Sequence, residues 1–356
     1  MHVPKLSQGD IKLKITHINL AKGFRGGERQ TQLLVEKLAG KIGKQTLICP
    51  KNSELAKRVT GENTQIESIS RPYLFFLKKC LNSDLLHAHD AKAAHFALLA
   101  HKRYGIPYLI TRRVPNKPKN NSFTRAIYAN TSVSVALSGA ISNVLKNRFG
   151  DINTTIIPSM KSRLTTDESN IQHLKSNFEG KFVVGHVGAL VKHHKGQQHI
   201  INIATKLEKI HPDILFVLVG NGADEQELKQ QANGLSNVAF TGFINNVGDY
   251  MAAFDMFIFP SLEEGLGSIL LDAMDFSLPI VANNVDGIPD IVKNEQNGLL
   301  VEPKNDHQLE QAVLRLYNDR KLATQLGSAG KIISDEYLPE TISNKYISLY
   351  ETILSQ

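Results

Sequence analysis

The sequence predicts an α/β protein of two domains, each built on a parallel sheet with helices on both faces. Three observations predict this fold class. The chain has 356 residues, which at roughly 100–200 residues per domain favours two domains. Short β-branched runs alternate with longer amphipathic segments from end to end, as in successive βαβ units. The runs are almost continuously apolar, as expected of parallel strands buried on both faces.

Each half of the chain contains six such apolar runs. In the N-terminal half we expect strands at 13–20, 45–49, 84–88, 107–111, 133–137 and 154–157, and helices at 27–42, 91–104 and 138–149. In the C-terminal half we expect strands at 182–187, 214–219, 238–241, 256–259, 279–282 and 299–301. Ligands of such sheets bind beyond the carboxyl ends of the strands, so two sheets with facing strand ends would form a cleft.

The polar stretch 160–180 interrupts this alternation and is interpreted as the connection between the domains. We expect an N-terminal domain over 11–160, a linker over 161–180 and a C-terminal domain over 181–337. A last helix, 338–356, is expected to pack back on the N-terminal domain.

The composition favours an anionic partner and a cytoplasmic location. A formal net charge of +7 suits a nucleotide, a phosphorylated substrate, an anionic membrane or a nucleic acid. Cys49 and Cys80 are too few for a disulfide framework or a thiolate metal site. The N-terminal residues lack the apolar core of a signal peptide, and no apolar run is long enough to span a membrane.

The most specific pattern is PSLEEGLGSILLDAM, residues 260–274. It directly follows the apolar strand MFIF and turns into a helical pattern. Glu264 would stand in the strand-to-helix loop, and Asp272 would lie inside the helix, within reach of a ribose. A helix start has free amide donors that suit a diphosphate. Here those donors belong to Gly267, Ser268 and Ile269. The alternative is a helix with acids near its start that only complement the helix dipole.

The block FPSLEEGLGSILLDAMDFSLPIVANNVDGIPDIVKNEQNGLLVEP resembles the C-terminal signature of retaining GT-B glycosyltransferases, specifically glycosyltransferase family 4, also called group 1. The segments GHVGALVKHHKG, LVGNGADEQELKQQA and FTGFINNVGDYMAAFDMFIFPS fit the same family in order and spacing. Over 15–150 the resemblance is looser. It implies the GT-B fold, two Rossmann-like parallel-sheet domains facing each other across a cleft, and a nucleotide diphosphate sugar as donor.

The resemblance also implies roles for individual residues. In the family pattern the first acid contacts hydroxyls of the donor sugar and the second binds the ribose. The two acids correspond to Glu264 and Asp272 here. The second is one methylene shorter than the Glu of the family pattern. Lys195, in GALVKHHKG, is implied as the cation that stabilises the departing diphosphate. Many members have Arg where this chain has Ala189, so a residue at 192–194 would replace it, or Lys195 would act with backbone amides.

Two further loops of the C-terminal half are expected beside the nucleotide. VGNGADE lacks the third glycine of a dinucleotide fingerprint, and we interpret Gly222 as part of a turn at the donor. GFINN, with Ile244, is expected to line the base, mostly through its backbone. No Asp-x-Asp pair occurs in the sequence, so we expect catalysis without a metal or other cofactor.

In the N-terminal half, KGFRGGERQ places Gly26 and Gly27 at a strand-to-helix turn, where the backbone can approach a phosphate or sugar closely. A helix start that only needs a flexible turn is the alternative. DLLHAHDAK ends a strand in His87 and His89. Histidines at a strand end are more often structural, but the resemblance implies that His89 lies against the donor sugar.

Two basic segments of this half point to the acceptor side. TRRVPNKPKNNSFTR, 111–125, follows another strand, and Arg112 and Arg113 would bind a phosphate or carboxylate of the acceptor. RPYLFFLKKC, 71–80, combines aromatic residues with flanking cations, as helices at membrane surfaces do. A core helix with a basic outer edge explains that segment equally well.

Together these features predict a retaining, metal-independent glycosyltransferase that moves a hexosyl or heptosyl group from a nucleotide diphosphate to an acceptor hydroxyl. The basic N-terminal half favours an anionic glycan or glycolipid acceptor, such as a lipopolysaccharide core, at the cytoplasmic face of a membrane. A sugar-nucleotide epimerase of the same fold, and a non-catalytic binder of nucleotide sugars or nucleic acid, are the alternatives. Nucleic acid fits poorly because the basic residues do not interleave with aromatic ones.

Overall fold

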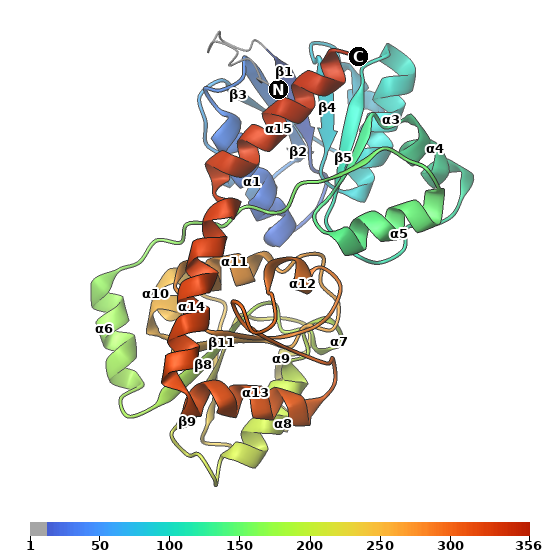
Figure 1. Ribbon diagram of the computed structural model, residues 1–356. Coiled ribbons are helices and arrows are strands. Elements are labelled where there is room, and N and C mark those ends of the chain that lie inside the picture. The colour runs from blue at the N-terminus through green and yellow to red at the C-terminus, as the bar shows by residue number, and fades with distance from the viewer. Residues whose placement is uncertain (1–12) are drawn as a thin grey trace, which may run out of the picture. The chain divides into compact units, whose positions relative to one another are not determined.

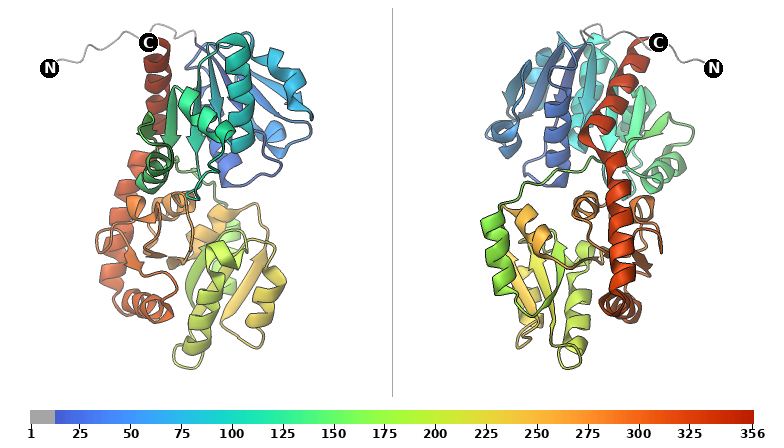
Figure 2. Two further views of the ribbon diagram at one scale, coloured as in Figure 1. Left: turned by 90° about the vertical axis from the view of Figure 1, so that its right-hand side faces the viewer. Right: turned by 60° about the vertical axis from the view of Figure 1, so that its left-hand side comes forward.

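The computed structural model describes residues 13–356, so residues 11 and 12 of the first expected domain lie outside the described part. The chain divides into two compact units (Figures 1 and 2). The N-terminal unit is Met1–Met160 together with Pro339–Gln356, and the C-terminal unit is Lys161–Leu338. Among the described residues, no helix is both long enough and apolar enough to cross a bilayer.

The sheet of the N-terminal unit has seven parallel strands in the order β3-β2-β1-β4-β5-β6-β7 among the described residues. They are β1 (Lys14–Ile18), β2 (Lys44–Pro50), β3 (Thr64–Ile69), β4 (Leu85–Ala88), β5 (Tyr108–Arg112), β6 (Val133–Ala136) and β7 (Thr154–Ile156). The sequence pattern missed β3. This edge strand reads TQIESI and is largely exposed, so it has no apolar run to reveal it.

Helices cover both faces of this sheet. They are α1 (Gly26–Leu38), α2 (Glu54–Arg58), the 3-10 helix η1 (Tyr73–Cys80), α3 (Ala91–Tyr104), α4 (Ser122–Asn130), α5 (Gly139–Phe149) and α15 (Pro339–Leu354). Helix α15 packs beside α1, and its buried Ile342, Tyr346 and Tyr350 join the core formed by β1, β4, β5 and β6 (Figure 1). The returning segment 339–356 therefore completes the N-terminal core.

The C-terminal unit has six parallel strands in the order β10-β9-β8-β11-β12-β13. They are β8 (Phe182–Val187), β9 (Ile214–Val219), β10 (Val238–Gly242), β11 (Met256–Phe259), β12 (Ile280–Asn283) and β13 (Leu299–Val301). Every residue of β8, β11 and β12 is buried, which explains their continuous apolar runs. Two Rossmann-like parallel-sheet units, as the sequence predicted, make up the chain.

The helices of this unit include one inside the segment expected to be a linker. They are α6 (Glu168–Asn177), α7 (Lys192–Lys195), α8 (Gln197–Leu207), α9 (Glu225–Gln231), α10 (Val247–Ala253), α11 (Ser268–Asp275), α12 (Ile288–Ile291), α13 (Asp306–Asn318), α14 (Arg320–Ser334) and the 3-10 helix η2 (Asp335–Tyr337). Helix α6 buries Ile171 and Leu174 and packs on α10. The structure thus differs from the linker interpretation of 161–180, because these two apolar residues attach the segment to the C-terminal unit.

Each sheet reverses its strand order once. In the N-terminal sheet the reversal lies between β1 and β4, and in the C-terminal sheet between β8 and β11. At such a point neighbouring loops turn away from each other beyond the carboxyl ends of the strands and leave room for a ligand. These two points are where the predicted site residues should be sought.

Candidate functional site

At the reversal point of the C-terminal sheet, two predicted catalytic residues meet. Lys195 is the last residue of α7, the short helix that follows β8, and Glu264 lies in the loop after β11. The Lys195 ammonium forms an ion pair with a Glu264 carboxylate oxygen. Their side chains are 25% and 17% exposed, so the pair is accessible without being fully solvated. The Lys195 nitrogen also lies 5.3 Å from the ring centroid of Phe259, the last residue of β11.

A buried histidine, His186, supports the segment that carries Lys195 through the side chain of Gln197. Burial lowers the pKa of His186 to about 4, although its hydrogen bond to the Ile258 carbonyl opposes the shift, so the ring is neutral. The Gln197 amide nitrogen donates to His186 Nε2 (3.2 Å) and to the Ala189 carbonyl (2.9 Å). Because Nε2 accepts, the ring proton resides on Nδ1, which donates to Ile258 (3.0 Å).

Gly196 explains why this loop can approach the neighbouring one. Its φ is +68°, and a Cβ there would lie 2.1 Å from the Pro260 carbonyl oxygen. Only glycine tolerates both conditions. In turn, the His194 carbonyl accepts from the amide of Leu262 (2.7 Å) and the hydroxyl of Ser261 (2.9 Å). The loops after β8 and β11 are therefore joined through their backbones.

Glu264 is fixed by a third loop, the one after β12. Its amide donates to the Asp286 carboxylate (3.0 Å), and its carbonyl accepts from the Gly287 amide (3.2 Å). Helix α11 begins directly beyond, with Gly267 as N-cap at a φ of +83°. The amides of Ser268 and Ile269 thus stand in the first turn of a helix, where they have no intrahelical acceptor.

Asp272 has a structural partner that the sequence did not indicate. It is 5% exposed, and its carboxylate accepts a 2.6 Å hydrogen bond from the amide of Ser162. Asp272 Oδ1 thereby fixes the backbone at Ser162, where the chain enters the C-terminal unit. The ribose contact that the resemblance implies stays a prediction.

The cations and histidines that were candidates to replace the arginine at Ala189 are largely engaged with acids. Lys192 pairs with Glu227, and His194 Nδ1 lies 3.1 Å from Glu263. His193 is exposed. Lys195 remains the cation that the geometry brings to Glu264.

Gly222 packs against the loop that follows β8. A Cβ on Gly222 would lie 2.2 Å from the Leu190 carbonyl oxygen, which also accepts from the Asp224 amide (3.0 Å). The Gly-x-Gly pair is therefore required for close approach of two backbones, whether or not a nucleotide lies beside it.

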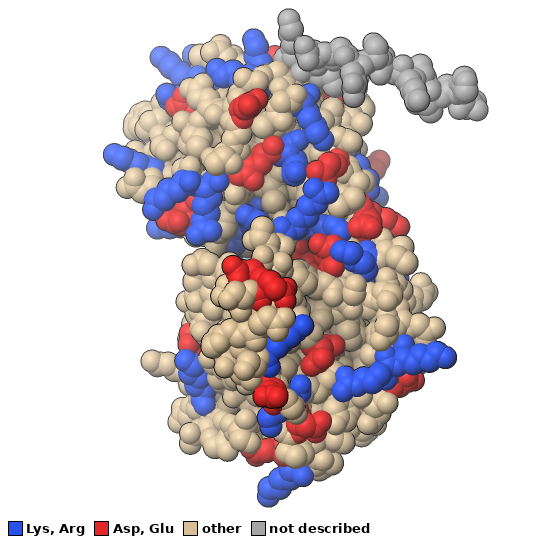
Figure 3. Space-filling view, turned by 90° about the vertical axis from the view of Figure 1, so that its left-hand side faces the viewer, with Lys and Arg blue, Asp and Glu red and all other residues tan. Residues whose placement is uncertain are grey.

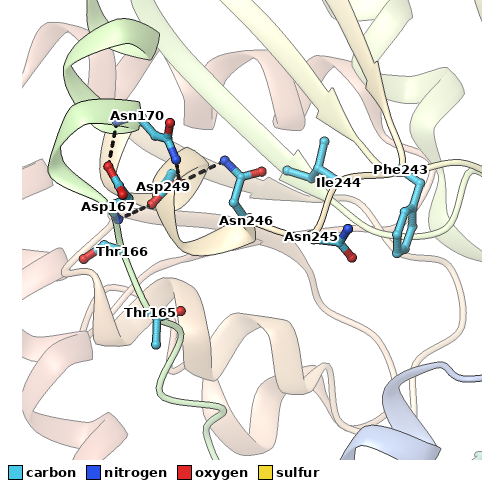
Figure 4. A pocket seen from close by; sticks show the side chains of 9 residues that line it. All are labelled: Thr165, Thr166, Asp167, Asn170, Phe243, Ile244, Asn245, Asn246 and Asp249. Carbon is cyan, nitrogen blue, oxygen red and sulfur yellow. Dashed lines mark hydrogen bonds between the residues drawn. The ribbon is translucent and has the colours of Figure 1, made fainter. Parts of the chain in front are cut away.

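A hollow of about 600 Å³ opens at the carboxyl end of β10 and includes the predicted Ile244 (Figure 4). Its lining comes from the loop 243–246, from α10, from the segment before α6 and from the first turn of α6. The lining residues are Thr165, Thr166, Asp167, Asn170, Phe243, Ile244, Asn245, Asn246 and Asp249. Phe243 is 66% exposed, an unusual state for a large apolar ring.

Asp249 organises the floor of this hollow. Its carboxylate accepts from the Asp167 amide (2.6 Å) and from the side-chain amides of Asn170 (3.1 Å) and Asn246 (2.9 Å), shown as dashed lines in Figure 4. Burial would raise the pKa of Asp249, but these three hydrogen bonds outweigh it and lower the pKa. The acid is thus ionised and fixed, and it holds the loop 243–246 in place.

At the reversal point of the N-terminal sheet, residues from three segments meet. His89 follows β4, Arg113 follows β5 and Gly27 is the second residue of α1. An Arg113 guanidinium nitrogen donates to His89 Nδ1 (3.3 Å), and a Cβ on Gly27 would lie 3.4 Å from Arg113 Cδ. Gly26 is the first residue of α1. The structure thus gathers Gly27, His89 and Arg113, which are far apart in the sequence.

His89 belongs to a buried chain of neutral histidines. Because Nδ1 accepts from Arg113, the His89 proton resides on Nε2 and is donated to His17 Nδ1 (3.0 Å). Burial lowers the pKa of His17 to about 4, although an interaction with Gln45 opposes the shift. Burial, and then the neighbouring rings and Arg113, lower the pKa of His89 well below its usual value, and His87 behaves alike.

The three histidine rings place ligand atoms within 4.8 Å of one another, a spacing that could hold a metal ion. However, His87 already binds the Tyr350 hydroxyl through Nδ1 (2.7 Å) and the Thr111 hydroxyl through Nε2 (2.7 Å). The cluster also lies beside the Arg113 guanidinium, which repels a cation. The residues present fit a hydrogen-bonded network better than a metal centre.

Arg112 is the other predicted acceptor ligand, and it is tied to its own loop. Its guanidinium donates to the Tyr128 hydroxyl (3.3 Å) and to the carbonyl of Asn116. Arg112 thus shapes the loop after β5, and Arg113 faces the histidines. Its contact with an acceptor stays a prediction, as does that of Arg113.

Sequence reasoning missed several residues of these clusters. Phe243 lay inside a segment expected to act through its backbone, and His186 was hidden in an apolar strand. Asp286 lies in NNVDGIPD, and this acid shortly after a strand is the signal that could have drawn attention to the loop after β12.

Comparisons with known proteins concern the family and the fold of the chain. Residues 168–332, just under half of the chain and all within the C-terminal unit, match the family model of glycosyl transferases group 1. An uncharacterised glycosyltransferase of Haemophilus influenzae is 26% identical over 294 residues, covering 78% of this chain and 81% of that protein.

Two further proteins extend the comparison. LpsD of Rhizobium meliloti, a lipopolysaccharide core biosynthesis glycosyltransferase, is 27% identical over 48% of this chain and 49% of its own length. The crystal structure of Anabaena Alr3699/HepE in complex with UDP and glucose superposes with a TM-score of 0.84 at 19% identity, over 95% of this chain and 99% of that one. This structural likeness confirms the GT-B fold.

Proposed function

We propose that this chain, whose residues 168–332 match the model of glycosyl transferases group 1, is a retaining glycosyltransferase that transfers the sugar of a uridine diphosphate sugar to an acceptor hydroxyl. The observation that carries the proposal is the Lys195–Glu264 pair at the point where the C-terminal sheet reverses its strand order. A cation, an acid and a helix start then converge where a ligand of such a sheet binds.

The dimensions of the sheet support a nucleotide along its carboxyl edge. The hollow beside Phe243 lies at β10, two strand spacings or ~10 Å from β8, whose loop carries Lys195. A base in the hollow would place its diphosphate near Lys195 and the start of α11. Phe243 and Ile244 would pack on the base, and Glu264 would accept hydrogen bonds from hydroxyls of the sugar.

The chemical step follows from these positions. As the bond from the sugar to the diphosphate breaks, negative charge grows on the leaving phosphate, and Lys195 with the amides of Ser268 and Ile269 would stabilise it. The departing phosphate would take the proton of the acceptor hydroxyl on the same face, which retains the anomeric configuration. The N-terminal unit would contribute His89 to the donor sugar and Arg112 and Arg113 to the acceptor. A glycan or glycolipid of a cell-surface polymer would be that acceptor.

The experiment separates this function from its alternatives. UDP-sugars are first ranked by thermal shift, because a ligand stabilises the folded state by mass action. The best donor is then incubated with and without glycan acceptors. UDP release that requires an acceptor, and a product with the donor's anomeric configuration by NMR, support the proposal. An isomerised sugar nucleotide from donor alone would make the protein an epimerase, and binding without turnover would make it a sensor.

A further inference from the structure

A second hollow, of about 370 Å³, lies in the N-terminal unit at the carboxyl ends of β1, β2 and β3. It is lined by Lys22, Pro50, Lys51, Asn52, Ser53, Arg71 and Tyr73. None of these residues belongs to the histidine cluster or to the loop of Arg112 and Arg113. The hollow is therefore distinct from both of those sets of residues.

Its chemistry is cationic. Lys22, Lys51 and Arg71 line it with no acidic residue, and no ion pair between described residues involves any of the three. The unit as a whole holds 26 Lys and Arg against 11 Asp and Glu, a net +15, whereas Lys161–Leu338 carries 15 against 23, a net −8. On the face shown in Figure 3, blue side chains form groups on the N-terminal unit. The excess positive charge of the protein thus belongs to the unit with this hollow.

An apolar edge adjoins the cations. Helix η1 begins at Tyr73 in the wall of the hollow, and it presents Leu74 and Phe75 to solvent, 56% and 80% exposed. Leu81, directly after the helix, is 52% exposed. Of the ten large apolar residues exposed in the described part of the chain, three lie within the eight positions 74–81. Apolar side chains grouped in this way on a protein surface are characteristic of interaction sites.

We propose that this face docks on an anionic lipid bilayer, with a lipid phosphate in the hollow and Leu74, Phe75 and Leu81 in the acyl region. The anionic membrane surface attracts the cationic side chains within a Debye length. Apolar side chains add the free energy of insertion into the bilayer, and stable attachment needs both contributions. A free phosphate would explain the cations but not the apolar edge. The proposal rests on the proposed function only where it implies that the acceptor is carried by a lipid.

The test measures partitioning of the full chain onto vesicles by co-sedimentation. We expect binding to phosphatidylcholine vesicles that contain about one third phosphatidylglycerol, little binding to phosphatidylcholine alone, and a loss of binding at high salt. Lys51→Glu should weaken partitioning about 25-fold, since it changes two unit charges at roughly fivefold each. Phe75→Ser should weaken it roughly tenfold.

Matched controls make the result specific. Lys44→Glu reverses an exposed charge at the opposite end of the same strand, β2, and Ile332→Ser removes an apolar side chain that is 73% exposed on α14. Both should partition like the unmodified chain. Equal binding to both vesicle types, or equal losses for Lys51→Glu and Lys44→Glu, would overturn the proposal. So would a Lys51→Glu variant that loses affinity for soluble glycerol phosphate yet keeps its vesicle binding. UDP-sugar turnover with a soluble acceptor is measured separately, so failure of docking and failure of catalysis are distinguishable.

Discussion

Replacing Glu264 by Gln is the most informative change, because it keeps the size of the side chain and removes its charge. The variant loses the ion pair with Lys195 and a charged acceptor for the sugar hydroxyls. Removing one such electrostatic contact from a transition state costs ~3–4 kcal/mol, so we expect kcat/KM to fall about 10²–10³-fold. Stability should change far less, by ~1 kcal/mol, because both side chains are partly exposed.

The assay compares initial rates of acceptor-dependent UDP release with thermal unfolding of the same samples. Glu310→Gln is the matched control, since Glu310 is 16% exposed, pairs with Lys206 at 3.3 Å and lies on α13. It should lose the same small amount of stability and keep its activity. Affinity for UDP alone should survive in the Glu264 variant, because the acid is placed at the sugar. A folded Glu264→Gln enzyme within about threefold of the unmodified kcat/KM would refute the reasoning.

Three further predictions follow from the same contacts. Gly196→Ala should destabilise the C-terminal unit by more than ~2 kcal/mol and lower kcat, because Gly196 has a φ of +68° and an added Cβ would lie 2.1 Å from the Pro260 carbonyl oxygen. Gly40→Ala is the control, since Gly40 has a φ of +75° in open space, and it should cost only about 1 kcal/mol. Equal losses of stability for the two variants in chemical denaturation would contradict this prediction. Lowering the pH from 7 to 5 should destabilise the N-terminal unit by about 2 kcal/mol per buried histidine. In the unfolded chain these rings gain protons below pH 6.5, whereas in the folded protein their lowered pKa values keep them neutral. A denaturation midpoint that does not change between pH 7 and pH 5 argues against neutral rings. Tyr350→Phe should lower the free energy of unfolding by about 1–2 kcal/mol, because His87 Nδ1 loses its 2.7 Å hydrogen bond with the Tyr350 hydroxyl. Calorimetry measures this loss, and an unchanged stability would mean that the hydrogen bond does not form.

The sequence carries much of the fold because parallel strands are buried on both faces. Runs such as FVVGHV and MFIF have no other plausible place, so the C-terminal sheet could be predicted strand by strand. The polar edge strand β3 escaped for the opposite reason, since its side chains contact solvent. Helix α6 escaped because only Ile171 and Leu174 attach it to the unit, too few for a visible apolar stripe.

The site divides in a similar way. Lys195 and Glu264 could be proposed because each lies in a short motif directly after a strand. Their mutual contact spans 69 residues and follows only from the strand order β8-β11. The contact of Asp272 with Ser162 spans 110 residues, and no local pattern encodes it. Local sequence thus gives the chemistry of the groups, and topology decides which of them meet.

The place of α15 has a consequence for how the protein is made. The C-terminal unit is one continuous stretch, but the N-terminal core stays open on the side of Ile342 and Tyr350 until the ribosome has added 178 more residues beyond Met160. At about 5–20 residues per second, that interval lasts roughly 10–35 s. During synthesis the second half is therefore expected to mature before the first, and a nascent chain halted before residue 339 would expose unpaired apolar surface to chaperones.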